Sequence, residues 1–394
     1  MDVFQKVVDR KQTRSVKWDM LQDVFQTDDV LPMWVADMDF KAPKEVNDAL
    51  CKRAEHGIYG YTVIDDEVKQ TVTHWVKHRH NWSIEEDSLS FSPGVVTSLH
   101  IAIQALTDPH DKVLIQTPVY TPFYNVIKAH ERRIIKNPLI LEDNYYKIDF
   151  TNFEDKLKEG VKAFILCSPH NPVGRVWTKE ELEEIGRLCI KHNVIMLSDE
   201  IHGDLTFPDH IHIPLASLSK EIADNTVTCM SPSKTFNLAG LQASYIITPN
   251  KSMKDKIDET LQAQGLGMLN TMGNTALEAA YKYGEEWLDT LRSVIQEHYT
   301  YVRDTIHNQT SNLRVSHSEG TYLLWIDCSG LGLDSDELET FMIKEAKVGL
   351  NKGESYGEEG DQFMRMNLAC PKETLEEGVK RIVKAANNHK NASF

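Results

Sequence analysis

The sequence predicts an α/β fold, in which a mostly parallel central sheet is covered by helices and followed by a smaller α+β domain. Four apolar runs without polar alternation indicate buried strands, at 112–116, 161–167, 194–197 and 226–230. Helical patterns separate these runs, and strands that alternate with helices form parallel sheets covered on both faces. The length of 394 residues is enough for two domains with sizeable cores.

Composition and charge indicate an ordinary globular protein. Hydrophobic residues make up 41% and charged residues 26% of the chain, as in typical soluble domains. The net charge of −16 and the lack of a Lys/Arg cluster argue against nucleic-acid binding. No apolar stretch approaches the ~20 residues needed to span a bilayer, so no membrane association is expected. The six cysteines are scattered without a Cys-x-x-Cys pair, which favours reduced thiols and a cytoplasmic protein.

The first 45 residues predict an arm that packs on the core. The segment LPMWVADMDF at 31–40 is extended and apolar, and it is punctuated by Pro32 and by Asp37 and Asp39. Two aspartates at this spacing can belong to a metal site, but no third ligand lies nearby in the sequence. No metal site is therefore predicted.

A helix is expected over 43–55, because its apolar residues recur on one face. The loop GIYGYT at 57–62 follows and carries Tyr59 and Tyr61. From the residues alone, a phenol in this loop either donates a hydrogen bond to a phosphate or simply packs.

The segment SPGVV at 92–96 precedes an apolar helical pattern that extends to Leu106. Gly94 is expected to let the backbone turn sharply there. The amides of Val95 and Val96 would then lie at a helix N-terminus, which is a site that binds anions.

Polar side chains follow the ends of the four predicted strands. Tyr120, Asn171, Asp199 and Lys234 each come after a different strand. In an open parallel sheet the carboxyl ends of the strands line one crevice, where ligands bind. We therefore expect these four side chains to converge.

The segment SPSKTFNLAG at 231–240 is the centre of this prediction. Ser231 and Ser233 flank a turn that also carries Lys234. Two hydroxyls and a lysine suit a phosphorylated aldehyde, since the hydroxyls would hold phosphate oxygens and the amine would form an imine. Pyridoxal phosphate is the cofactor that needs both features. Taken alone, the segment also fits a turn with a solvated lysine.

The rest of the chain predicts further helices and a second sheet. Thr178 and Glu181 form a capping-box pattern that opens a helix. Arg365 stands inside a predicted apolar strand, where a guanidinium needs an anion; from the residues alone, this anion is either an internal carboxylate or a substrate carboxylate. Other elements are expected at 243–248, 251–263, 274–283, 287–301, 321–326 and 362–368. We expect a large domain over 46–286 and a small domain made of 1–45 and 287–394.

In the order and joint presence of its motifs, the chain resembles the fold-type I pyridoxal-phosphate enzymes of the aminotransferase superfamily. It is most similar to their MalY/PatB-type cysteine-S-conjugate β-lyase branch, which includes cystathionine β-lyases. The resemblance covers essentially the whole chain. Its carriers are LPMWVADMDF (31–40), YGYT (59–62), SPGVV (92–96), TPVY (117–120), NPVGRVW (171–177), SDEIHGD (198–204), SPSKTFNLAG (231–240) and Arg365.

The resemblance implies a role for each predicted site residue. Lys234 would be the catalytic lysine bonded to the cofactor aldehyde, and Asp199 would pair with the pyridinium nitrogen. The other cofactor contacts would be Tyr120 stacked on the ring, Asn171 and His202 near the ring oxygen, and Ser231, Ser233, Val95 and Val96 around the phosphate.

The resemblance also implies how subunits and substrate are held. Tyr61 would reach the phosphate in the neighbouring subunit, which implies a homodimer with shared active sites. Arg365 would bind the α-carboxylate of an amino-acid substrate, with Asn171 and the backbone at Ala36 at the same end of the pocket. His202 stands where aspartate aminotransferase-like relatives have a tyrosine, as is usual in the β-lyase branch.

The activity implied by the resemblance is β-elimination of an S-substituted L-cysteine to thiol, pyruvate and ammonia. Two alternatives remain open on the sequence: an aminotransferase of amino acids, and a regulatory protein-binding role of the MalY type. The residues do not identify the S-substituent, the group that protonates the leaving sulfur, or any regulatory partner.

Overall fold

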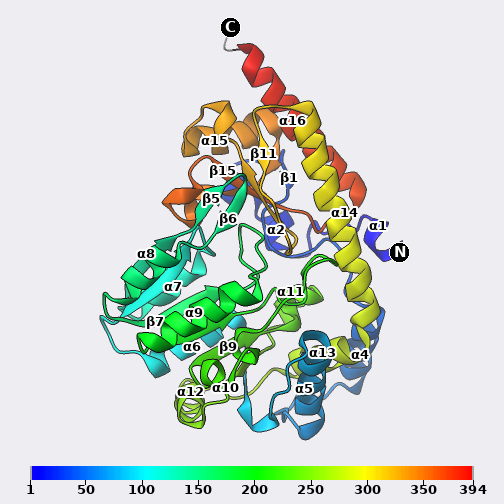
Figure 1. The fold of residues 1–394 in the computed structure, drawn as a ribbon. Helices are drawn as coiled ribbons and strands as arrows, with labels where there is room; N and C mark the ends of the chain where they lie inside the picture. Colours follow the sequence, from blue (N-terminus) through cyan, green and yellow to red (C-terminus); the bar gives the residue numbers. More distant parts are fainter. Residues whose placement is uncertain (1, 393–394) are drawn as a thin grey trace.

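The computed structural model describes residues 2–392 and contains a seven-stranded central sheet and a four-stranded second sheet (Figure 1). The strand order of the central sheet is β2-β10-β9-β8-β7-β3-β4. Only β10 runs antiparallel to its neighbours, so the predicted mostly parallel sheet is confirmed. Its strands are β2 (Leu89–Ser92), β3 (Lys112–Thr117), β4 (Arg133–Pro138), β7 (Val161–Cys167), β8 (Ile195–Asp199), β9 (Thr226–Met230) and β10 (Ser244–Ile247).

Helices cover both faces of this sheet, because its inner strands are apolar on both sides. Val113 and Ile115 of β3 belong to one hydrophobic core, whereas Leu114 between them belongs to another. The first core includes α6 (Val95–Leu106), α7 (Pro122–Ala129) and α12 (Lys251–Ala263). The second includes α8 (Phe150–Leu157), α9 (Lys179–Lys191) and α10 (Lys220–Asp224).

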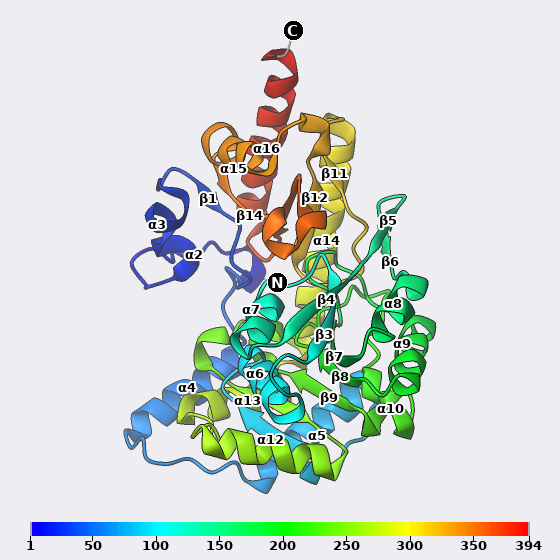
Figure 2. The ribbon, with the colours of Figure 1, turned by 90° about the vertical axis from the view of Figure 1, so that its left-hand side faces the viewer.

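The second sheet has the order β11-β12-β15-β14 and lies beside the long helices α14 and α16 (Figure 2). The arm pairs with this part of the chain, since Leu31 of β1 is in register with Val348 of β13. The elements are β1 (Leu31–Pro32), β11 (Arg314–Val315), β12 (Leu323–Asp327), β13 (Val348–Gly349), β14 (Asn351–Lys352), β15 (Phe363–Asn367), α14 (Glu285–Gln309), α15 (Ser335–Phe341) and α16 (Lys372–Ala392).

The chain has further α-helices and a hairpin outside these two groups. They are α1 (Asp2–Gln5), α2 (Val16–Asp19), α3 (Leu21–Phe25), α4 (Lys44–His56), α5 (Asp66–His80), α11 (Pro232–Thr235), α13 (Thr271–Tyr283), and the hairpin β5 (Ile140–Glu142) with β6 (Tyr145–Lys147). No helix within residues 2–392 has the length and apolar character to cross a bilayer. The central sheet falls within the predicted domain 46–286; the division into two domains stays a prediction.

Most predicted elements are present, and the differences have physical reasons. The capping box of Thr178 and Glu181 is formed. The strand β2 was not predicted, because its serines are typical of a loop. In the structure Ser92 is buried, and its hydroxyl forms hydrogen bonds with those of Ser98 (2.7 Å) and Ser244 (2.8 Å). The strands β4, β5 and β6 were also not predicted, and α14 extends to Gln309, beyond the expected end at 301.

Candidate active site

The carboxyl ends of four neighbouring strands bring the predicted polar residues together. The strands β3, β7, β8 and β9 lie side by side in the sheet. Tyr120, Asn171, Asp199 and Lys234 follow them in that order. The charge of Asp199 acts on both Tyr120 and Lys234, which places all three in one electrostatic environment. Asn171 joins this group through Arg365, which donates to its Oδ1 (3.3 Å) and whose charge also acts on Tyr120 and Lys234. The four side chains therefore lie around one site.

Lys234 is held by a short helical turn that the sequence specifies locally. Ser231 caps α11, since its Oγ accepts a hydrogen bond from the amide of Ser233 (3.0 Å), and Pro232 occupies the first helical position. The Lys234 Nζ donates a hydrogen bond to the carbonyl oxygen of Ala36 (2.7 Å). Burial and then the charge of Arg365 lower the pKa of Lys234 to about 8, against opposing effects of Asp37 and Asp199. The amine is thus more easily deprotonated than an ordinary lysine.

Asp199 is a buried carboxylate at the end of β8. Its Oδ1 accepts a hydrogen bond from the amide of Ile201 (3.1 Å). Burial raises its pKa to about 7, and the neighbouring Glu200 adds to this effect. A cationic group beside a buried carboxyl favours its ionised form. Asp199 is therefore suited to hold a protonated ring nitrogen.

Arg365 lies in β15 and is buried without a carboxylate partner among residues 2–392. Its guanidinium donates to the carbonyl oxygen of Trp34 (2.8 Å) and to Oδ1 of Asn171 (3.3 Å), and it lies over the ring of Tyr356. Its Nε has no hydrogen-bond partner. Of the two anions that the sequence left open, the internal carboxylate is absent from the described chain. The guanidinium remains available for a ligand carboxylate.

Tyr120 and His202 are both neutral in this environment. Burial, followed by the charge of Asp199, raises the pKa of Tyr120 to about 12. Burial, followed by the charges of Lys234 and Arg365, lowers the pKa of His202 to about 3. The His202 Nδ1 is buried without a hydrogen-bond partner, so it can bond to a ligand oxygen.

The predicted anion site at Val95 and Val96 is the N-terminus of α6. Val95 and Val96 are the first residues of this helix, where backbone amides have no intrahelical acceptor. A Cβ on Gly94 would meet no atom within 4 Å, so open space adjoins these amides. The backbone of Gly94 itself is extended (φ 168°). The chain bends at Pro93 and passes from the end of β2 at Ser92 to the start of α6 at Val95 over two residues, so the expected sharp turn is formed.

The two predicted hydroxyls differ in how they are used. The Ser231 Oγ donates to the carbonyl oxygen of Ala243 (2.7 Å), so its proton is committed to the turn. The Ser233 hydroxyl has no hydrogen-bond partner within the described chain. In this conformation, Ser233 is the hydroxyl that is free for a phosphate oxygen.

Tyr61 lies away from the other predicted residues of its own chain. Its side chain is 96% exposed, and within residues 2–392 it makes no hydrogen bond or ring contact. The neighbouring Ile58, Tyr59 and Val63 are exposed as well. This loop therefore contributes nothing to the site of the same subunit in the structure.

Two site residues were missed by the sequence reasoning. Tyr322 is buried, and its hydroxyl donates to the carbonyl oxygen of Ala36 (3.1 Å), the same acceptor that Lys234 uses. The Asn367 Nδ2 donates to the carbonyl oxygens of Val35 and Asp37 (2.6 Å each) and so fixes the backbone around Ala36. Tyr322 lay in a predicted strand and no local signal set it apart.

Asp37 and Asp39 anchor this segment through ion pairs. Arg10 contacts both carboxylates, at 2.6 Å and 2.7 Å, and Lys17 contacts Asp39 at 2.6 Å. The described residues contain no group of three or more potential metal ligands.

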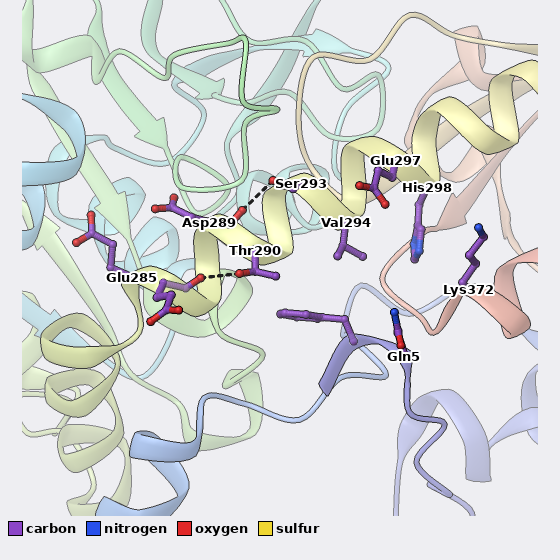
Figure 3. A pocket seen from close by; sticks show the side chains of 11 residues that line it. Gln5, Glu285, Asp289, Thr290, Ser293, Val294, Glu297, His298 and Lys372 are labelled. Atoms are coloured by element: carbon purple, nitrogen blue, oxygen red, sulfur yellow. Dashed lines mark hydrogen bonds between the residues drawn. The ribbon is translucent and has the colours of Figure 1, made fainter. Parts of the chain in front are cut away.

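The cavity shown in Figure 3 is separate from these residues. It has a volume of about 820 Å³ and lies along α14, facing α1 and the start of α16. Acidic side chains such as Glu286 and Glu297 line it, together with Phe4 and Lys372. None of the predicted site residues contributes to it, so it is not a candidate for the active site.

Comparison with known proteins agrees with this geometry. Residues 29–382 match the family described as aminotransferase class I and II. Cystathionine beta-lyase PatB of Bacillus subtilis (strain 168) is 47% identical over 380 residues, which are 96% of this chain and 98% of that protein.

Two solved structures with bound pyridoxal 5'-phosphate are also similar. Cystalysin from Treponema denticola has a TM-score of 0.95 and 38% identity, with 98% of each chain covered. The C-S lyase from Staphylococcus hominis has a TM-score of 0.90 and 32% identity, with 97% of each chain covered.

Proposed function

The chain belongs to the class I and II aminotransferase family, and from this premise we propose that it is a pyridoxal-phosphate-dependent carbon–sulfur lyase. The reaction is β-elimination of an S-substituted L-cysteine to thiol, pyruvate and ammonia. Relatives that align over nearly the whole chain bear the names cystathionine β-lyase and C-S lyase. The substrate class includes cystathionine and other cysteine S-conjugates.

The residues fit pyridoxal phosphate at each of its polar ends. The phosphate would lie at the amides of Val95 and Val96, with the free hydroxyl of Ser233. The ring nitrogen would meet Asp199, whose raised pKa favours a cationic partner. The ring oxygen would lie near Asn171 and His202, whose Nδ1 is otherwise unpaired. Tyr120 would stack on the ring, and Lys234 would bond to the aldehyde.

The cofactor, when bound, supplies an electron-withdrawing ring that stabilises negative charge at the substrate Cα. Lys234 removes the Cα proton, which requires the neutral amine that its lowered pKa supplies. Asp199 keeps a proton on the ring nitrogen. Arg365 holds the substrate carboxylate, and the oxygen of Asn171 beside it fixes the guanidinium. The leaving sulfur takes its proton from Lys234 or Tyr120.

The observation that carries the proposal is that Arg365 lies near Lys234. A buried guanidinium without a carboxylate partner lies close enough to a lysine amine to lower its pKa. This arrangement suits a substrate that carries a carboxylate next to the carbon to be deprotonated. An α-amino acid has this chemistry, and a sulfur on its β-carbon is a good leaving group.

The test is turnover of L-cystathionine and of an S-alkyl-L-cysteine by the cofactor-loaded protein, without any keto acid. We expect thiol and pyruvate in equal amounts over many turnovers. If no pyruvate forms and amine transfer begins when a keto acid is added, the protein is an aminotransferase instead.

We further propose that the enzyme is a homodimer with shared active sites. The exposed loop at 57–63 supports this, because Ile58, Tyr59, Tyr61 and Val63 are apolar or aromatic and have little cover in the single chain. Tyr61 would act on the phosphate in the partner subunit.

A cytoplasmic location is proposed from the six free cysteines, five of them buried.

A further inference from the structure

Two buried histidine–carboxylate pairs have no part in the proposed reaction. Their carboxylates, Glu200 and Asp204, follow the end of β8. The Nε2 of His80 lies 3.0 Å from Oδ1 of Asp204, and the Nε2 of His212 lies 2.8 Å from Oε2 of Glu200. The two imidazole rings meet edge to face, with centroids 5.3 Å apart. All four side chains are buried. Burying four titratable groups costs free energy unless they are paired with one another.

The first pair touches the turn that carries Lys234. The hydroxyl of Thr235, the residue after Lys234, donates to Oδ2 of Asp204 (2.8 Å). Burial alone would raise the pKa of Asp204, but the contact with His80 and the hydrogen bond from Thr235 bring it below its usual value. Asp204 is therefore a charged acceptor, and hydrogen bonds to charged acceptors are the stronger ones.

The second pair fixes the loop that carries Asp199. Glu200 follows Asp199 directly, and its side chain accepts hydrogen bonds from Ser198 Oγ (2.8 Å) and the Leu215 amide (3.1 Å) as well as from His212. The packing is tight, because a Cβ on Gly203 would lie 2.9 Å from the His212 ring. The loop between Glu200 and Asp204 is thus held at both ends.

We propose that Asp204, which is in contact with His80, is a positioning residue that fixes Lys234 through the hydrogen bond from Thr235. His80 is the last residue of the 15-residue helix α5, so the network ties the lysine turn to a long helix. On the other side, the Lys234 amine is bonded to Ala36. The backbone and the amine of Lys234 are therefore held independently. This inference rests on the proposed function, in which Lys234 is the reacting group.

The main test compares Thr235→Val with Thr226→Val in the full-length holoenzyme. Thr226, in β9, is a matched control. It is buried like Thr235, and its hydroxyl donates a hydrogen bond to the Ile222 carbonyl oxygen (2.7 Å), away from Lys234. Both variants lose one buried hydrogen bond and are expected to melt at lower temperatures than the wild-type protein, Thr235→Val at the lowest because its lost acceptor is charged. Only Thr235→Val should lower kcat, by about tenfold or more, as small misplacements of reacting groups do. Its KM should stay within about twofold of the wild-type value, and Thr235→Ser should restore kcat, since its hydroxyl can still reach Asp204.

A second readout does not depend on turnover. At limiting pyridoxal phosphate, borohydride reduction followed by peptide mass spectrometry measures the fraction of Lys234 joined to the cofactor. We expect a lower fraction in Thr235→Val than in wild-type protein and Thr226→Val. Should the wild-type enzyme release no thiol, the proposed function fails, yet this comparison still decides whether the lysine is positioned by Thr235.

A double-mutant cycle tests whether Asp204 acts through Thr235. Asp204→Asn should lower kcat, and adding Thr235→Val to it should lower kcat little further. Independent, multiplying losses would overturn the proposed path. So would a Thr235→Val variant that melts lower, as Thr226→Val does, but keeps the wild-type kcat and trapped fraction, because the network would then serve stability alone.

Discussion

The Lys234 Nζ and the carbonyl oxygen of Ala36 lie 2.7 Å apart, although 198 positions separate the two residues in the sequence. The same carbonyl accepts the hydroxyl of Tyr322. Asn367 donates to the carbonyl oxygens of Val35 and Asp37, the residues on both sides of Ala36. The reactive amine is therefore aimed by a backbone atom of the N-terminal arm, and the arm is held in turn by the second sheet.

The lowered pKa of Lys234 predicts how attachment of the cofactor depends on pH. Only the neutral amine attacks an aldehyde, so the attachment rate should rise with pH and reach half its maximum near pH 8. Stopped-flow absorbance after mixing cofactor-free protein with pyridoxal phosphate measures this rate. Arg365→Met should move the midpoint upward, because the Arg365 charge helps to lower the pKa. A wild-type midpoint near the ordinary lysine value of 10.5 would contradict the assignment.

The unpaired Arg365 predicts a selective loss of substrate binding. Arg365→Met should raise the KM for an S-alkyl-L-cysteine between about 10-fold and 100-fold, because charge-assisted hydrogen bonds contribute ~1.5–3 kcal/mol. The measurement is steady-state thiol release over a range of substrate concentrations. Arg187→Met is the control, since Arg187 is exposed on α9 and paired with Glu184. An unchanged KM in Arg365→Met would show that Arg365 serves only the packing of β15.

The hydrogen bond from Tyr322 to Ala36 predicts a role for a residue that carries no motif. Tyr322→Phe keeps the ring but frees the Ala36 carbonyl from one of its two donors. We expect a loss of unfolding free energy of ~1 kcal/mol together with a fall in kcat. As a control, Tyr145→Phe removes a tyrosine hydrogen bond outside the site, to the Glu319 carboxylate (2.9 Å). Equal kcat values in the two variants would remove Tyr322 from the active site.

The exposure of Tyr61 predicts complementation between two defective subunits. Tyr61→Ala removes the contact that a subunit would make with the phosphate in its partner's site. Lys234→Ala removes the catalytic lysine from the subunit's own site. In a mixed dimer one of the two sites has both residues intact, so random mixing should restore about a quarter of the wild-type sites. Activity of co-expressed variants, compared with each variant alone, measures this. No recovery in dimers shown to be mixed would exclude a shared site.

The site could be predicted where chemistry follows from position along the chain. Tyr120, Asn171, Asp199 and Lys234 were placed together because each ends a parallel strand, and the sheet has those strands as neighbours. Buried strands are recognisable from apolar runs, such as residues 163–167 of β7. This reasoning failed for β2, whose buried serines satisfy one another across the sheet.

The rest could not be predicted, because it depends on partners that are distant in sequence. The acceptor for Lys234 is a backbone carbonyl, which carries no sequence signal. His80 and Asp204 are 124 positions apart, and no motif contains both of them. The ion pairs of Asp37 and Asp39 involve Arg10 and Lys17, which look like surface cations in a polar stretch. Only the fold brings such groups into contact.

Identification of the residue that bonds the cofactor tests the account most directly. The protein is loaded with pyridoxal phosphate, reduced with borohydride and digested, and the modified peptide is sequenced by mass spectrometry. The account predicts that the cofactor is on Lys234, and that Lys234→Ala yields no specifically modified peptide and releases no thiol from an S-alkyl-L-cysteine. Modification of a different lysine, or a Lys234→Ala enzyme that turns over at the wild-type rate, would contradict it.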